Sequence, residues 1–220
     1  MTATAGRACP LRYRYGAAAI ATAPEREAET LYLVGGLYGN LPALEAVLAL
    51  GEAEPDPVKL CFNGDFNWFD CDDETFAAIN RAVLAHDATL GNVEAELQPE
   101  ADDAGCGCAY PEIVSQDVVD RSNLIHARLK DTASRHQDVL DRLARLPMFA
   151  RYRVSGTLVG VVHGDPDSLA GWQFDAGALD DPANAGIIER FFCDARVDVF
   201  ASSHTCLPAM RRFGRRLVVN

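Results

Sequence analysis

The sequence has no long apolar stretch, because nowhere in its 220 residues do about 18 apolar residues follow one another without interruption. We therefore expect no membrane span. The weakly apolar segment 17–22 is too short for the hydrophobic region of a signal peptide, so we expect a cytoplasmic protein. No internal repeat or low-complexity tract stands out either, and the length suits one domain over residues 1–220.

Positive charge is also scarce. The chain has 20 Lys and Arg residues against 32 Asp and Glu residues, a formal net charge of −12 and a pI near 4.8. Proteins that bind a nucleic-acid backbone usually have a basic face, so we expect no nucleic-acid partner. One basic cluster occurs near the end of the sequence, and we interpret it as the solvated side of an edge hairpin. Its members are Arg211, Arg212, Arg215 and Arg216.

The cysteine pattern argues against a disulfide framework, because the seven cysteines are an odd number and no signal peptide precedes them. Cys61 and Cys193 lie in apolar runs and are interpreted as core residues. The pair Cys106 and Cys108, together with Cys206, leaves a zinc-thiolate or redox role open. Unpaired thiols are the interpretation that we favour, because a Cys-x-Cys spacing alone is unspecific.

Against these absences stands a composition with 49 % hydrophobic and 24 % charged residues, which is typical of a globular protein with a substantial core. Short β-like runs alternate with helical patterns. We expect strands at 30–34, 58–62, 88–90, 151–154, 157–162, 197–201, 210–213 and 215–219, and helices at 40–50, 73–85 and 184–193. Residues 98–110 are expected to form a loop. The segment 111–146 is expected to form two helices that break near residues 130–131.

Polar side chains recur just after the predicted strands. Asp65, Asn92, His163 and His204 each follow a strand at its carboxyl end. Such loops gather at one edge of an α/β sheet, so these four side chains are expected to converge on a metal site. Each has a structural alternative, as a turn residue, a helix cap or a hydrogen-bonded histidine. The donor set suits Mn²⁺, Fe²⁺ or Zn²⁺ better than Ca²⁺.

These segments resemble, in order, the five sequence blocks of the calcineurin-like phosphoesterase family, over about Leu31 to Leu207. The family patterns are Asp-x-His-Gly-Asn, Gly-Asp, Gly-Asn-His-Asp/Glu, a His after a strand, and Gly-His-Thr-His. The corresponding segments here are Gly36–Asn40, Gly64–Asp65, Gly91–Glu94, His163–Gly164 and Ser203–Cys206. The resemblance implies a four-layer α/β/β/α sandwich of two mixed sheets, with residues 111–146 as a helical insertion that roofs the site.

The departures from the family pattern fall mostly on one metal site. Its ligands come from the first, second and fifth blocks, and the residues here are Gly36, Tyr38, Asp65 and Cys206. Glycine has no ligand atom and neutral tyrosine is a poor ligand, so the resemblance implies that this site is empty or altered. The ligands of the other metal site are all present, as Asp65, Asn92, His163 and His204. The resemblance therefore implies one divalent ion per chain.

Three replacements bear on catalysis. The third-block His, thought to stabilise the transition state or protonate the leaving group, is replaced by Val93, and a positioned general acid is typically worth about 10²–10⁴-fold. Tyr38 is interpreted as filling the vacated volume, with a hydrogen bond to a substrate oxygen as the alternative. Cys206 could rebuild the altered site with Asp65 and with one or both of Cys106 and Cys108, because thiolates bind Zn²⁺ well.

Three hypotheses on function remain open at this point. The first is a metal-dependent phosphoester hydrolase that acts on a small phosphorylated substrate. The second is an inactive homologue that binds a phosphorylated ligand, phosphate or a partner, and the third is a zinc-thiolate or redox protein. Trp172 and Phe174, which follow His163, are expected to line a substrate pocket. The family usually continues past the position of Asn220, so either the protein itself is trimmed or the sequence is part of a longer chain, and the oligomeric state stays open as well.

Overall fold

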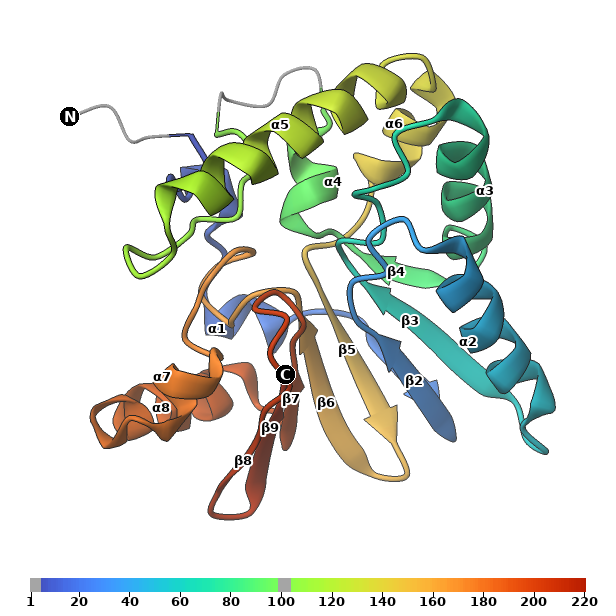
Figure 1. The fold of residues 1–220 in the computed structure, drawn as a ribbon. Helices are drawn as coiled ribbons and strands as arrows, with labels where there is room; N and C mark the ends of the chain where they lie inside the picture. Colours follow the sequence, from blue (N-terminus) through green and yellow to red (C-terminus); the bar gives the residue numbers. More distant parts are fainter. Residues whose placement is uncertain (1–4, 99–103) are drawn as a thin grey trace.

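The computed structural model describes residues 5–98 and 104–220, which fold around two β-sheets (Figure 1). A six-stranded sheet has the order β1-β5-β6-β7-β9-β8, and a three-stranded sheet has the order β2-β3-β4. The strands of the smaller sheet are β2 (Thr30–Val34), β3 (Val58–Asn63) and β4 (Asp87–Thr89). Those of the larger sheet are β1 (Glu25–Ala28), β5 (Phe149–Val154), β6 (Thr157–Val162), β7 (Val199–Ala201), β8 (Met210–Phe213) and β9 (Arg216–Val219).

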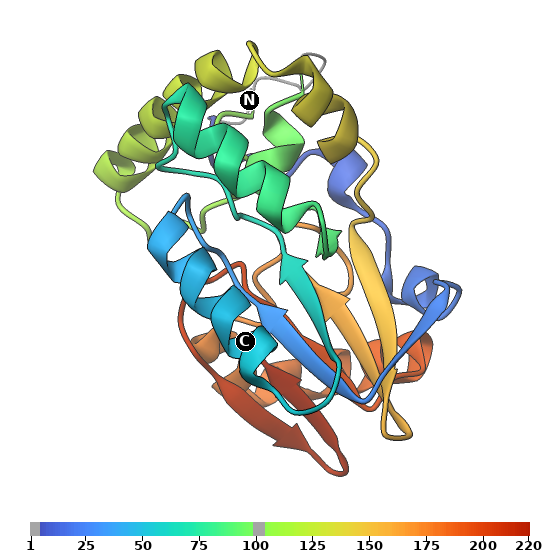
Figure 2. The ribbon, with the colours of Figure 1, turned by 90° about the vertical axis from the view of Figure 1, so that its right-hand side faces the viewer.

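Two helices, α2 (Leu41–Ala53) and α3 (Asp73–Val83), cover the outer face of the smaller sheet (Figure 2). The Asn40 side chain caps α2 by accepting a hydrogen bond from the Ala43 amide at 3.0 Å, as the sequence predicts. Leu44 and Phe76 bury their side chains against Phe62 of β3. All strand pairs of this sheet are parallel, so β3 directs its carboxyl end, and the loop after it, toward the same edge as its neighbours.

The larger sheet is mixed, because β5 pairs with β6 and β8 pairs with β9 in antiparallel fashion while its other pairs are parallel. Its outer face packs against α1 (Ala17–Ile20), α7 (Ala176–Asp180) and α8 (Ala185–Ala195). Phe192 of α8 stacks against Phe200 of β7 with ring centroids 4.8 Å apart.

A third apolar cluster lies between the two sheets and joins Cys61 and Leu33 to Tyr152 and Val161. The chain is therefore an α/β/β/α sandwich, as the resemblance implies. Only the larger sheet is mixed, however, since the three described strands of the smaller sheet all run parallel.

The segment 111–146 forms two helices, α5 (Gln116–Ala133) and α6 (Gln137–Leu143). The break comes after Ala133 rather than near residue 130, because Leu129 and Ala133 are both fully buried and extend the packed face of α5. A short helix, α4 (Asn92–Glu96), lies beneath α5 (Figure 1). Two single turns of 3-10 helix, η1 (Leu11–Tyr13) and η2 (Pro182–Asn184), complete the described elements.

The sequence did not predict β1, α1, α4 or α7. The β1 sequence Glu-Arg-Glu-Ala has no apolar alternation, because β1 is an edge strand that exposes charged side chains. Part of the predicted loop 98–110, residues 99–103, lies outside the described residues. None of the helices within residues 5–98 and 104–220 is long and apolar enough to cross a membrane.

Candidate metal centre

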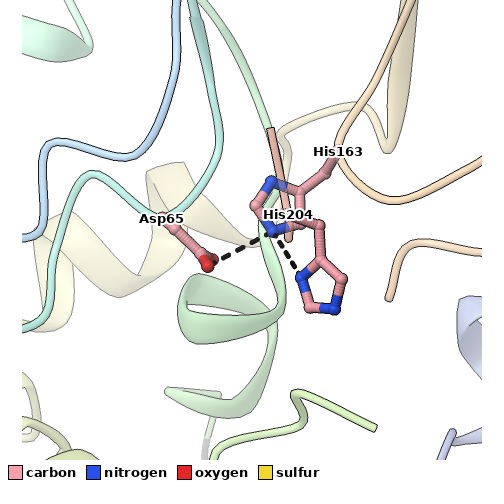
Figure 3. Close-up of side chains that lie close together, drawn as sticks. All are labelled: Asp65, His163 and His204. Carbon is pink, nitrogen blue, oxygen red and sulfur yellow. Dashed lines mark hydrogen bonds and ion pairs between the residues drawn. The ribbon is translucent and has the colours of Figure 1, made fainter. Parts of the chain in front are cut away.

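The strand ends bring the polar residues together at one edge of the molecule. Asp65 follows β3 of the smaller sheet, whereas His163 and His204 follow β6 and β7 of the larger sheet. Asn92 is the first residue of α4, just after β4. All four side chains are buried. Figure 3 shows the side chains of Asp65 and His204 directed at the same nitrogen atom of His163.

The Nε2 atom of His163 is the centre of this cluster. It lies 3.3 Å from Asp65 Oδ2, 3.1 Å from Asn92 Oδ1 and 3.3 Å from His204 Nδ1. The ligand atoms of Asp65, His163 and His204 all lie within 4.8 Å of one another. A metal ion bound at about 2.0–2.2 Å from each nitrogen or oxygen atom needs donors at separations of this order.

The backbone fixes which atom of each ligand faces the centre. His163 Nδ1 donates to the Asn63 carbonyl at 2.8 Å, Asn92 Nδ2 donates to the Cys106 carbonyl at 2.9 Å, and His204 Nε2 donates to the Cys108 carbonyl at 3.1 Å. The opposite atom of each side chain therefore presents a lone pair to the centre. Metal-binding histidines are commonly oriented by such outer hydrogen bonds, which also fix their tautomers.

The electrostatics of the cluster match a cation site. Burial alone would raise the pKa of Asp65, but the neighbouring His163 and His204 hold it below its usual range. Burial opposes the charge on His163, yet its contact with Asp65 raises the pKa of His163 above its ordinary value. Burial and the nearby His163 lower the pKa of His204 to about 4. Four inward lone pairs with one ionised carboxylate fit a divalent metal ion.

Glu94 supports the cluster from behind, a role that the sequence reasoning missed. Its carboxylate accepts hydrogen bonds from the backbone amides of Asp65 at 2.8 Å, Asn67 at 3.1 Å and Gly91 at 3.2 Å. Burial and the adjacent Asp65 raise the pKa of Glu94 to about 7. Its place in the third block, Gly91–Glu94, was the available signal.

Glycine is required where the two loops meet. Gly64 has a φ of +71°, and a Cβ atom there would lie 2.5 Å from the Gly91 Cα. The close approach of these loops allows the Asp65 Oδ1 atom to accept a hydrogen bond from the Val93 amide at 3.1 Å.

A side chain fills the space beside Gly36, one of the positions that the resemblance assigns to the second metal site. The Tyr38 ring packs beside Gly36, so that a Cβ atom on residue 36 would come within 2.6 Å of the ring. The Tyr38 hydroxyl lies 2.7 Å from Cys206 Sγ, and burial raises the pKa of Tyr38. An aspartate at position 36 would therefore collide with Tyr38, which supports the interpretation of Tyr38 as a filler.

The cysteines do not rebuild that site. Among the described residues, Asp65, His163 and His204 are the one group of three or more His, Cys, Asp or Glu side chains with converging ligand atoms. Cys106 and Cys108 contact each other, but Cys206 forms no such group with them, so the prediction that all three sulfurs lie close together is wrong. Cys206 instead contacts Tyr38, and the carbonyls of Cys106 and Cys108 orient two of the candidate ligands, Asn92 and His204.

A cavity of 290 Å³ opens beside the cluster. It is lined by Tyr38, Asp65, Trp68, Phe69, Val93, Cys108, Tyr110, Ser122, Trp172, His204, Thr205 and Cys206. Trp172 lines it as expected, and its indole donates to the Cys108 carbonyl at 3.1 Å. The prediction for Phe174 is wrong, because this side chain is fully buried against Phe191 and Phe200 behind the larger sheet. Ser122 belongs to α5, so the helical insertion forms one wall of the cavity.

Val93 also lines the cavity, at the position of the family's third-block His. His126 of α5 lies close by, with its Nε2 atom 3.1 Å from the Val93 carbonyl. It is buried and does not line the cavity, so it does not supply the missing imidazole.

Two solved structures have a fold similar to that of this chain. A hypothetical protein from Pyrococcus horikoshii matches with a TM-score of 0.58 and 16 % identity, covering 88 % of this chain and 75 % of that one. A metallophosphoesterase from Sphaerobacter thermophilus matches with a TM-score of 0.53 and 18 % identity, covering 86 % of this chain and 74 % of that one. No family model and no curated protein matches the sequence. The chain therefore has the calcineurin-like metallophosphoesterase fold.

Proposed function

We propose that the protein is a metal-dependent phosphoester hydrolase that works with one divalent ion per chain. The observation that carries the proposal is the orientation of the candidate ligands. Three separate backbone carbonyls hold the outer atoms of Asn92, His163 and His204 and leave their lone pairs directed at one point beside Asp65. Without an ion, the one proton that His163 Nε2 can carry is shared among the three acceptor atoms that face it, whereas a divalent ion would satisfy all four side chains at once.

A divalent ion held by these residues would act as a Lewis acid on a phosphoryl oxygen and lower the pKa of a bound water. The chain's own residues do the remaining work. Asp65, Asn92, His163 and His204 would hold the ion at the edge of the cavity, which Asp65 and His204 line. The Tyr38 hydroxyl and the Cys206 thiol lie together on the cavity wall. Val93 cannot donate a proton, so the leaving group departs without help from an imidazole at that position.

Metal content tests this proposal directly. Protein purified without chelator or added metal should contain about one Mn, Fe or Zn ion per chain by elemental analysis. The variants His163→Ala and His204→Ala should lose the ion, whereas Cys206→Ala should keep it as a matched control from the same wall. Wild-type protein that contains no ion, and takes up none from added Mn²⁺, Fe²⁺ or Zn²⁺, would refute the proposal.

The alternative is a binding protein that holds a phosphorylated ligand without hydrolysing it. Val93 at the position of the general acid favours this second reading. The two readings differ in turnover of the metal-loaded protein. Release of 4-nitrophenol from chromogenic phosphoesters that is abolished in Asn92→Ala supports the hydrolase, and tight binding without release supports the binding protein.

A further inference from the structure

The walls of the cavity show which phosphoester fits it. Four of its aromatic side chains form two pairs. Trp68 and Phe69 follow Asp65 and form an edge-to-face pair with centroids 6.4 Å apart. Tyr110 and Trp172 form a tilted pair with centroids 6.2 Å apart. Trp172 also packs edge-on against His204, at 5.2 Å, so one aromatic wall reaches the metal cluster itself.

These walls are held in place without a ligand. The Tyr110 hydroxyl lies 3.0 Å from Ser122 Oγ of α5, and the Trp172 indole donates to the Cys108 carbonyl. Trp68 is buried, whereas Phe69 is 67 % exposed at the rim. Phe69 therefore offers an apolar surface near Asp65 and His204, in the same cavity, for an aromatic substituent of a ligand.

The second feature is the charge of the cavity. Neither Lys nor Arg lines it, and the two stretches outside the described residues, 1–4 and 99–103, contain neither residue. Phosphate sites usually carry arginine or lysine to balance the phosphoryl charge. Here a divalent ion and the Asp65 carboxylate together leave one net positive charge, and Glu94 behind Asp65 can only reduce it. A phosphodiester carries one negative charge, whereas a phosphomonoester carries about −1.5 to −2 at pH 7.

The third feature is Val93, which lines the cavity at the position where the resemblance places an acid. Its side chain cannot donate a proton to the leaving group, so esters with intrinsically good leaving groups should react fastest. Phenols leave more readily than alkyl alcohols because their anions are stabilised by the ring. The cavity of 290 Å³ lies just below the range of about 300–1,000 Å³ found for small-molecule sites, so it suits a small ester.

From these three features we infer that the site takes aryl phosphodiesters, with the aromatic group against Phe69, Tyr110 and Trp172, in preference to phosphomonoesters. The inference rests on the proposed function. In the reaction the oxygen of a water molecule forms a bond to phosphorus and the bond from phosphorus to the aryl oxygen breaks. The water's proton goes to the departing phenolate, so the products are a phosphomonoester and a phenol.

Intrinsic fluorescence offers a direct binding test, because both tryptophans of the chain, Trp68 and Trp172, line this cavity. Zn²⁺-loaded protein, with its metal content measured first, is titrated with diphenyl phosphate, phenyl phosphate, dimethyl phosphate and phosphocholine. We expect diphenyl phosphate to bind at least tenfold more tightly than the other three. Hydrolysis of bis(4-nitrophenyl) phosphate should likewise exceed that of 4-nitrophenyl phosphate at least tenfold in kcat/KM.

Phe69→Ala should weaken diphenyl phosphate by roughly two- to tenfold and leave both dimethyl phosphate binding and zinc content unchanged. Leu50→Ala, which removes an exposed apolar side chain on α2, is the matched control and should change nothing. If phenyl phosphate binds as tightly as diphenyl phosphate, the argument from the charge of the cavity is overturned. If dimethyl phosphate binds as tightly as diphenyl phosphate, the argument from the aromatic walls is overturned. Tightest binding of phosphocholine would assign the aromatic walls to a cationic group instead. A protein that holds zinc but prefers no aryl diester refutes this inference alone, whereas a protein that holds no metal refutes the proposed function.

Discussion

Metal binding at this centre should depend on pH in a way that the geometry sets. In the metal-free protein, His163 Nε2 faces three acceptor atoms at 3.1–3.3 Å, and its pKa is raised above the ordinary value of 6.5 by Asp65. Below that pKa the Nε2 atom carries a proton, which a metal ion must displace. His204, with a pKa of about 4, is already neutral at pH 5, and Asp65 is already ionised.

The expected magnitude follows from this proton count. Between about pH 5 and pH 6.5, the dissociation constant for Mn²⁺ should rise at least tenfold for each unit by which the pH falls, because at least one proton is exchanged per ion. The slope should become shallower above the His163 pKa. Glu94, with a pKa of about 7, adds up to one further proton if the ion's charge lowers that pKa.

Free Mn²⁺ can be measured by electron paramagnetic resonance in equilibrium titrations across this range. His136→Gln, at a histidine that pairs with Asp73 away from the cluster, should retain the wild-type slope. An affinity that does not change between pH 5 and pH 6.5 would show that the ion does not compete with a proton on His163, and the assignment of Nε2 as a ligand would fail.

Three further predictions follow from single side chains. Asp70 is buried with no hydrogen-bond partner on Oδ2 among the described atoms, and burial raises its pKa from 3.8 to about 6, so its ionised form destabilises the fold above that pH. Asp70→Asn should therefore raise the free energy of unfolding relative to wild type by roughly 3 kcal/mol at pH 8 and by almost nothing near pH 4. Urea denaturation at the two pH values measures this difference. An equal effect of the substitution at both pH values would contradict the prediction. Gly107→Ala should weaken metal binding about 10–100-fold, because Gly107 has a φ of +67° and an added Cβ would lie 2.4 Å from the Tyr13 hydroxyl. The strain would shift the carbonyls of Cys106 and Cys108, which orient the ligands Asn92 and His204. Tyr38→Phe should leave one ion per chain by elemental analysis, since Tyr38 fills space rather than binding metal; loss of the ion would show that its hydroxyl supports the site.

Local sequence predicted most of the elements. The cap at Asn40 and the apolar spacing after it gave α2 within a few residues, and the β-branched run before His163 gave β6. Both predictions depend only on residues that are close together in the sequence. Where the signal was absent the prediction failed, as for the charged edge strand β1, whose place depends on pairing with β5. Phe174 was misplaced for a related reason, because its aromatic side chain gave no indication of which face of the larger sheet it would cover.

For the candidate metal centre, too, some features follow from the local sequence and others only from the tertiary structure. By itself the sequence determined that Asp65, Asn92, His163 and His204 follow strands, and that Gly36 and Val93 lack the donor atoms of the family pattern. Only the tertiary structure decided the directions of the side chains. The carbonyls of Cys106 and Cys108 turn Asn92 and His204 inward, and Tyr38 fills the neighbouring position. The physical reason is that strand order and burial are encoded locally, whereas the orientation of a lone pair depends on hydrogen-bond partners that the fold brings from distant parts of the chain.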